Sequence, residues 1–102
     1  MVVEAHADML APADRVWAEV KRTLERRGVR PSRTDDRELV LEVRGSGGLS
    51  RTVRVGQTLG PRSRCTERIE VPSGALAPVL WVRAQVAARW RLARLKRTAR
   101  TL

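Results

Sequence analysis

Few residues in this sequence are of a type that carries out covalent or metal chemistry. Among 102 residues there is one histidine, His6, and one cysteine, Cys65. A single histidine, with no acid and nucleophile at a suggestive spacing, does not indicate a Ser-His-Asp relay or a histidine metal site. A single cysteine cannot form an internal disulfide or a zinc site of several cysteines. We therefore assign no catalytic residue, no metal ligand and no cofactor, and the sequence leaves enzymatic activity open.

Glu67 is the polar residue with the most informative position. It lies at an inward position of a strand expected over residues 62–71, between Cys65 and Ile69. A lone carboxylate among apolar side chains is costly unless it is paired, and Arg51, at an inward position of the preceding strand, is a candidate partner. We favour a structural salt bridge. The alternative is a polar anchor for a ligand, because binding cavities place few polar groups among many apolar ones. Cys65 is expected to be buried and unreactive.

The hydrophobic pattern predicts that an α+β fold positions these residues. Apolar and polar residues alternate in four stretches, which indicates half-buried strands, and apolar residues recur at helical spacing in two others. Leu39, Leu41 and Val43 should point inward from the second strand. Short turns should join the last three strands into an antiparallel sheet with both helices on one face, and segment 28–36 should be a loop. We expect one domain with strands over residues 1–9, 37–44, 49–57 and 62–71 and helices over residues 12–27 and 75–100.

The first helix is expected to bury an apolar stripe that contains Trp17 and Leu24 against the sheet. Pro12 suits the start of this helix and Gly28 its end. One buried stripe is what an amphipathic helix needs, so we interpret Trp17 as a core residue and not as a platform on which a ligand stacks. The Gly-rich segment 45–48 lacks the Lys-Ser/Thr ending of a phosphate loop, and we predict a hairpin turn there.

Charge is distributed unevenly along the chain. The net charge is +10, and residues 71–102 carry seven basic and no acidic side chains. Such asymmetry is typical either of a surface that contacts nucleic acid or an anionic membrane, or of the solvated face of an arginine-rich helix. We favour the solvated face. With three Trp and neither Phe nor Tyr, the chain has few rings on which single-stranded bases could stack.

The last helix has apolar stripes on two nearly opposite sides. A helix on a small sheet needs to bury only one of them. We therefore expect the other stripe to face a partner, by preference a second subunit, which predicts a homodimer through residues 75–100. One stripe comprises Val79, Val82, Val86, Trp90 and Ala93, and the other comprises Trp81, Ala84, Ala88, Leu92, Leu95, Ala99 and Leu102.

Several stretches resemble the START-like (SRPBCC) superfamily, the group that includes Bet v 1, polyketide cyclases/dehydrases and lipid-transport proteins. Residues 11–17, APADRVW, are similar to the start of the first helix in that superfamily. The last strands and the C-terminal helix of a bacterial subgroup are similar to residues 47–51 (GGLSR), 64–81 (RCTERIEVPSGALAPVLW) and 89–93 (RWRLA). The segment between the first helix and the last strands is much shorter here than in family members, so the chain resembles a shortened member.

The resemblance implies a helix-grip fold, in which an antiparallel sheet curves around a long C-terminal helix with an apolar ligand cavity between them. It implies binding of a small hydrophobic molecule such as a lipid or polyketide and, if the chain is an enzyme, a reaction of the cyclase or dehydrase type. The alternative is a shortened, non-catalytic oligomerisation or interaction module whose basic C-terminal helix contacts nucleic acid or an anionic membrane. The residues expected to bind the ligand are Leu41, Val43, Arg51, Val53, Val55, Glu67, Ile69 and Trp81.

Nothing in the sequence indicates membrane insertion or secretion. The longest apolar run, residues 75–82, is far shorter than the roughly 20 residues that span a bilayer. The N-terminus has Glu4 and Asp8 where a secretory signal carries a basic region and an apolar run. We expect a cytoplasmic protein.

Overall fold

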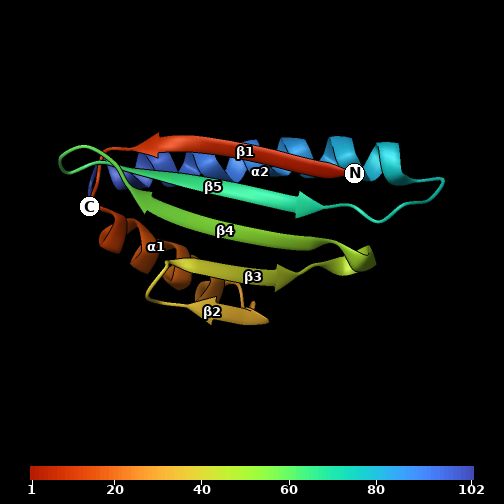
Figure 1. Cartoon of the computed structure of the whole chain (residues 1–102), viewed down its shortest axis with the longest axis horizontal. Coiled ribbons are helices and arrows are strands. Elements are labelled where there is room, and N and C mark those ends of the chain that lie inside the picture. Colours follow the sequence, from red (N-terminus) through yellow and green to blue (C-terminus); the bar gives the residue numbers. More distant parts are fainter.

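Both helices pack on the same face of one antiparallel five-stranded sheet in the computed structural model of the chain (Figure 1). The structure describes residues 1–102, except for the side chain of Ser46. The predicted α+β class, with a short N-terminal and a long C-terminal helix, is confirmed. In chain order the elements are β1 (Val2–Met9), α1 (Ala13–Arg26), β2 (Arg33–Asp35), β3 (Val40–Arg44), the 3₁₀ turn η1 (Ser46–Gly48), β4 (Ser50–Gln57), β5 (Ser63–Glu70) and α2 (Ala77–Ala99).

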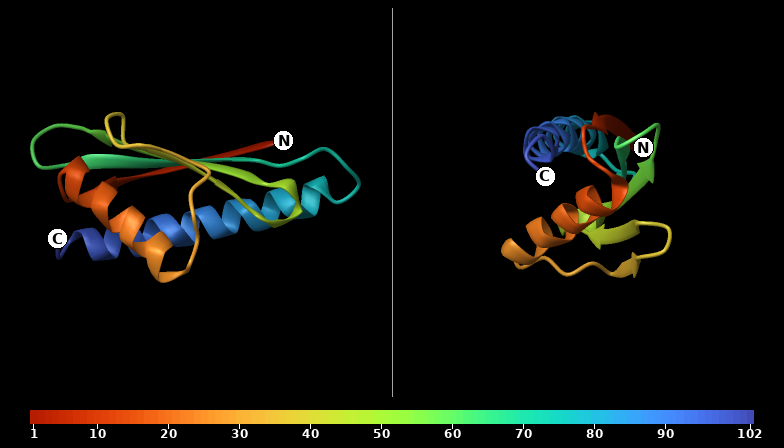
Figure 2. Two further views of the ribbon diagram at one scale, coloured as in Figure 1. Left: turned by 90° about the horizontal axis from the view of Figure 1, so that it is seen from below. Right: turned by 90° about the vertical axis from the view of Figure 1, so that its left-hand side faces the viewer.

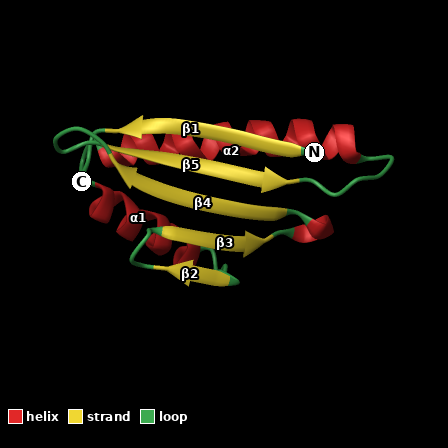
Figure 3. Cartoon of the chain, viewed as in Figure 1, coloured by secondary structure: helices red, strands yellow, loops and turns green.

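The strand order in the sheet is β1-β5-β4-β3-β2, and every neighbouring pair is antiparallel (Figure 3). Strands β2 to β5 follow one another as a meander, whereas β1 joins the sheet beside β5, with Val2 opposite Glu70. Alternate side chains of a strand point to the same face. In β5 the buried residues are Ser63, Cys65, Glu67 and Ile69, so the inward positions predicted for Cys65, Glu67 and Ile69 are confirmed.

The sheet has one strand more than the sequence predicts. Segment 28–36, expected to be a loop, contains the three residues of β2, which pair with β3 at one edge of the sheet. The strand expected over residues 37–44 is shorter and begins only at Val40. The expected loop over residues 28–36 and the expected strand start at residue 37 were therefore wrong, because the chain forms β2 and turns back on itself before Val40.

A turn held by Asp35 explains this difference. The Oδ1 atom of Asp35 accepts hydrogen bonds from the backbone N–H groups of Arg37 (2.9 Å) and Glu38 (3.2 Å). Such side-chain to backbone bonds stabilise tight turns. Leu39, expected at an inward strand position, completes the turn with a positive φ of 57°. The alternation of apolar residues therefore begins at Leu39, one residue before the strand starts at Val40.

Helix α1 begins where Pro12 ends the preceding extended segment. The Pro12 carbonyl accepts the first helical hydrogen bond, from the backbone N–H of Val16 at 3.1 Å. The Trp17 indole N–H donates to Asp36 Oδ1 at 2.8 Å, which satisfies the one polar atom of a buried ring. As expected, the face of α1 toward the sheet buries Val16, Trp17, Val20 and Leu24.

Helix α2 runs along β1 and β5 and buries one of its two apolar stripes (Figure 2). The buried stripe contains mostly small side chains, which let the helix approach the sheet closely. The opposite stripe faces away from the sheet. The buried residues include Ala84, Ala88, Leu92 and Ala99, and the exposed large apolar residues are Val79, Val82, Val86 and Trp90.

The buried apolar side chains form two clusters. The larger joins α1, the C-terminal half of α2 and the middle strands, and the smaller joins the N-terminal half of α2 to β1 and β5. Within the described part of the chain, neither helix has an apolar stretch long enough to cross a membrane.

Candidate ligand-binding cleft

A cleft of about 340 Å³ lies between α1, the C-terminal half of α2 and the strands β4 and β5. The end-on view in Figure 2 shows α1 and α2 on the same side of the sheet. The cleft is partly open to solvent. Its apolar lining is contributed by Val20, Val53, Cys65, Leu92 and Leu95.

Arginines dominate the polar lining of this cleft. The acidic residues that line it are Glu19 and Glu67, and the basic ones are Arg26, Arg27, Arg51, Arg91 and Arg94. The lining therefore carries more positive than negative charge and also contains apolar side chains.

Glu67 lies on the floor of the cleft between two of these arginines. Its side chain is only 1% exposed. It accepts a hydrogen bond from Arg51 Nε on β4, and the Nε of Arg91 on α2 donates to its Oε1 at 2.9 Å and its Oε2 at 3.3 Å. The predicted salt bridge between Arg51 and Glu67 is confirmed. Because the sheet and α2 each supply an arginine to this carboxylate, the three charges join the helix to the sheet.

One carboxylate balances only one of the two guanidinium groups. Burial lowers the pKa of Arg51, the neighbouring Glu67 charge acts against this effect, and the like charge of Arg91 lowers the pKa further. Within the described part of the chain, the side-chain hydrogen bonds of Arg51 and Arg91 all use Nε. The terminal Nη groups of both arginines therefore remain able to donate to another acceptor.

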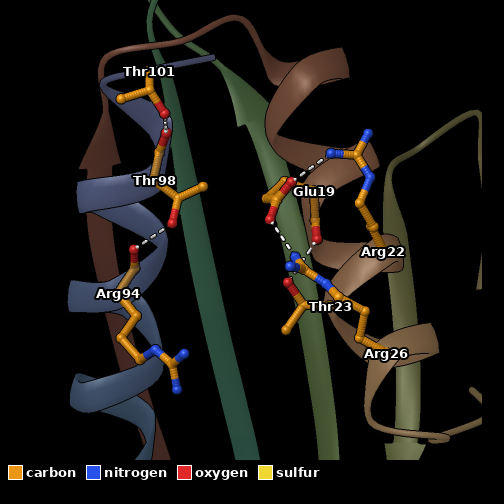
Figure 4. A network of polar contacts seen from close by, with 7 residues as sticks. All are labelled: Glu19, Arg22, Thr23, Arg26, Arg94, Thr98 and Thr101. Atoms are coloured by element: carbon orange, nitrogen blue, oxygen red, sulfur yellow. Dashed lines mark hydrogen bonds and ion pairs between the residues drawn. The ribbon is translucent and has the colours of Figure 1, made fainter.

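A second ion-pair network lies on the α1 side of the cleft (Figure 4). Glu19, which is 7% exposed, accepts from Arg22 Nη1 at 2.9 Å through Oε2 and from Arg26 Nη2 at 2.8 Å through Oε1. In Figure 4, α1 and α2 stand on either side of the space, and Arg94 extends from α2 toward it. Arg94 forms no ion pair with any described residue. Arg94 is thus a cation at the rim of the cleft without a carboxylate of its own.

Cys65 lies beside Glu67 on the cleft floor and is 1% exposed. Burial raises the pKa of its thiol to about 12, and the negative charge of Glu67 contributes to the same shift. The thiolate is the nucleophilic form of cysteine. A thiol that stays protonated at neutral pH fits the predicted unreactive role. His6 is exposed on β1 and does not line this cleft.

The eight predicted ligand-binding residues fall into three groups. Arg51, Val53 and Glu67 line the cleft. Leu41, Val43 and Val55 are buried in the larger core cluster without lining it. Ile69 and Trp81 belong to the smaller cluster, where the Trp81 indole N–H donates to the backbone carbonyl of Val2 at 3.3 Å. The structure brings the first group together and places the other two outside the cleft.

Sequence reasoning did not identify the residues that the helices contribute to the cleft. On α2 these are Arg91, Leu92, Arg94, Leu95 and Thr98, and on α1 they include Glu19 and Val20. A signal for the α2 residues was present, since steps of three and four residues place them on one side of a helix. Glu19 carried a weaker signal, because it lies on the buried face of an amphipathic helix between Val16 and Val20.

No model of a known protein family matches this chain, and no curated protein matches it either. The functional conclusion therefore rests on the residues that line the cleft. Within the described residues, no group of histidine, cysteine or acidic side chains could hold a metal ion. The lining of the cleft combines apolar side chains with charged hydrogen-bond donors, an arrangement suited to binding a molecule without covalent chemistry.

Proposed function

We propose that the cleft binds a small hydrophobic molecule, such as a lipid or polyketide, between the sheet and α2. The observation that carries this proposal is the cleft of about 340 Å³ with Val20, Val53, Leu92 and Leu95 in its lining. Sites for small ligands are concave, mostly apolar and roughly 300–1,000 Å³ in volume. The cleft lies at the lower end of this range, which favours a ligand with a short chain or a few rings.

The resemblance to the START-like (SRPBCC) superfamily supports the same proposal. The open antiparallel sheet with a long helix across it is compatible with a helix-grip fold. In that fold the ligand lies between the sheet and the C-terminal helix, where this chain has its cleft. A cyclase or dehydrase reaction would need a group that moves protons, and we propose a binding role because the buried carboxylate is already engaged by two arginines.

A substitution that fills the cleft tests the proposal. Leu95→Trp places a larger side chain in the cleft lining, and Val86→Trp adds a tryptophan on the outward face of α2 as the matched control. Calorimetric titration with decanol, an uncharged amphiphile, measures the affinity, and thermal unfolding verifies that both variants fold. We expect Leu95→Trp to weaken binding at least about tenfold, which corresponds to 1.4 kcal/mol. Equal affinities of the two variants, or no binding by the unmodified chain, would contradict the proposal.

The exposed stripe of α2 favours a second candidate function, attachment to an anionic membrane surface. Val79, Val82, Val86 and Trp90 are 53–67% exposed and lie along one side of the helix. The helix has six basic and no acidic residues. Helices that combine an apolar face with flanking cations lie in the interface of anionic bilayers. A second copy is the competing occupant, but an interface between two such helices would bring twelve cations together without a carboxylate from either helix.

Vesicle binding tests this second candidate. We expect the protein to co-sediment with phosphatidylglycerol vesicles more than with phosphatidylcholine vesicles, and the difference to shrink with added salt. Trp90→Ser should reduce sedimentation, whereas Leu59→Ser, at a loop residue that is 89% exposed, should not. Three results would overturn it: a stable dimer in light scattering that Trp90→Ser dissociates, binding to duplex DNA in preference to vesicles, or no binding to either.

A further inference from the structure

The charge left over in the cleft points to the chemical class of its ligand. Arg51 and Arg91 share the single carboxylate of Glu67, so this cluster carries one uncompensated positive charge. The Arg51 and Arg91 side chains are 22% and 27% exposed. Both are therefore partly shielded from water, and an anion placed beside them would interact with them more strongly than at an open surface.

The geometry of the two guanidinium groups leaves donors for such an anion. Each of them binds Glu67 through Nε. A guanidinium has five N–H donors in a planar fork, of which four belong to the Nη groups. The Nη pair is the part of arginine that engages carboxylates and phosphates in two parallel hydrogen bonds. Glu67 thus fixes the orientation of both side chains and leaves their terminal donors for a ligand.

The rim of the cleft adds further positive charge. Arg94 on α2 and Arg27 at the end of α1 line the cleft from opposite sides, and neither forms an ion pair with a described residue. Arg26, by contrast, is engaged by Glu19. A ligand head at the rim would therefore approach two free cations and the Nη donors of Arg51 and Arg91, while its apolar part contacts Leu92 and Leu95.

We propose that the ligand of this cleft is an anionic amphiphile, with a carboxylate or phosphate head held by Arg51, Arg91 and Arg94 and an apolar tail over Leu92, Leu95 and Val53. This inference rests on the proposed function, because it specifies the ligand that the cleft takes. It also changes the role of Glu67. The carboxylate is a positioning residue for the two arginines and does not contact the ligand.

Three probes with the same apolar chain test the proposal: decanoate, decyl phosphate and decanol. Calorimetric titration of the full chain at low salt should show decanoate and decyl phosphate binding at least about tenfold more tightly than decanol, since a hydrogen bond between a guanidinium and an anionic head is stronger than one to an uncharged hydroxyl. The ratio between the two anions distinguishes a fatty-acid carboxylate from a lipid phosphate as the source of the head group. A preference for either anion over decanol supports the proposal.

Charge-removing variants locate the site. Arg94→Gln and Arg91→Gln should each reduce the preference for the anions over decanol at least about threefold, while Arg83→Gln, an exposed α2 position outside the cleft lining, should leave this preference unchanged. Equal binding of all three probes would overturn the anionic ligand and leave the proposed function standing. No binding of any probe would remove both. An anion preference that falls in Arg83→Gln and not in Arg94→Gln would also overturn the site, because general surface charge would then explain it.

Discussion

The Glu67→Gln substitution measures how far this fold depends on the carboxylate shared by Arg51 and Arg91. Glutamine keeps the shape of the side chain but removes its charge, so two like charges remain close together beneath α2. The two arginine side chains are 22% and 27% exposed, and water from the cleft screens them only in part. Removing one member of a buried ion pair costs about 3–5 kcal/mol. Because the cleft is open to water, we expect a loss near the lower end, about 3 kcal/mol in the free energy of unfolding.

Urea unfolding followed by tryptophan fluorescence measures this loss directly. For a domain of this size, 1 kcal/mol shifts the midpoint of thermal unfolding by about 4–8 °C, so we expect a midpoint roughly 12–24 °C lower. The matched control is Glu19→Gln, a second buried carboxylate that is bound by two arginines. Its partners Arg22 and Arg26 are 60% and 63% exposed and can turn to water. We expect this control to lose about 1 kcal/mol or less.

The comparison between the two variants is the decisive result. The two carboxylates are buried to a similar degree, whereas the arginines that bind them are not. We therefore attribute the larger loss of stability in Glu67→Gln to the burial of its arginines. Equal losses in Glu67→Gln and Glu19→Gln would refute this attribution. An unchanged stability of Glu67→Gln would show that the shared charge does not hold α2 against the sheet.

Further predictions concern pH and packing. Since the pKa of the Cys65 thiol is raised to about 12, the unfolded chain loses this proton first. Stability should therefore fall as the pH rises above 9.0, the ordinary pKa of a cysteine thiol, by about 2 kcal/mol at pH 10.5, and Cys65→Ala should remove this part of the pH dependence of urea unfolding. Hydrogen bonds from Lys21 and then from Trp17 lower the pKa of Asp36. The Trp17 indole N–H signal in NMR should therefore shift only below pH 3.8, the ordinary pKa of an aspartate side chain, and the stabilisation that this contact provides should be lost as the pH falls through the lowered pKa. Leu41→Ala, at a fully buried position, should cost about 2–5 kcal/mol in the same unfolding assay, whereas a loss below 1 kcal/mol would contradict its place in the core.

The alternation of residues along β5 made part of the cleft predictable. A period of two places Cys65, Glu67 and Ile69 on one face of a strand, and a buried carboxylate requires a partner. Arg51 satisfies this requirement because β4 is the next strand in the sheet, where Val53 lies directly opposite Glu67 and Arg51 is one inward position away. Local pattern and hairpin order are sufficient for this inference, and it is confirmed.

The contribution of α2 could not be predicted in the same way. Whether Arg91 reaches Glu67 depends on where the helix crosses the sheet and on which of its two apolar stripes is buried. The sequence leaves both open, because two nearly opposite sides of the helix each carry an apolar stripe. The structure settles both points. Arg91 directly precedes the buried Leu92, and its Nε lies 2.9 Å from Glu67 Oε1. The position of Arg94 in the cleft lining follows from the same placement.

Strand β2 was missed for a different physical reason. It has only three residues, none of them apolar, and it pairs at the edge of the sheet with β3 alone. A period of two cannot be recognised over three polar residues. The turn that creates the strand depends on hydrogen bonds from two backbone N–H groups to Asp35, and aspartate is common in loops without such bonds.

The position of β1 has a consequence for the order in which this chain folds. Strands β2 to β5 are joined by short turns and can pair as soon as each is made, whereas β1 finds its only partner strand in β5 and packs under α2. Contacts between distant parts of a chain form slowly, because closing the intervening loop costs entropy before any contact is gained. The meander should therefore assemble first, and β1 should dock last. Until then the inward stripe of α2, which packs mainly on β1, has no complete sheet to cover it, so this helix is the segment most exposed to unwanted contacts during folding.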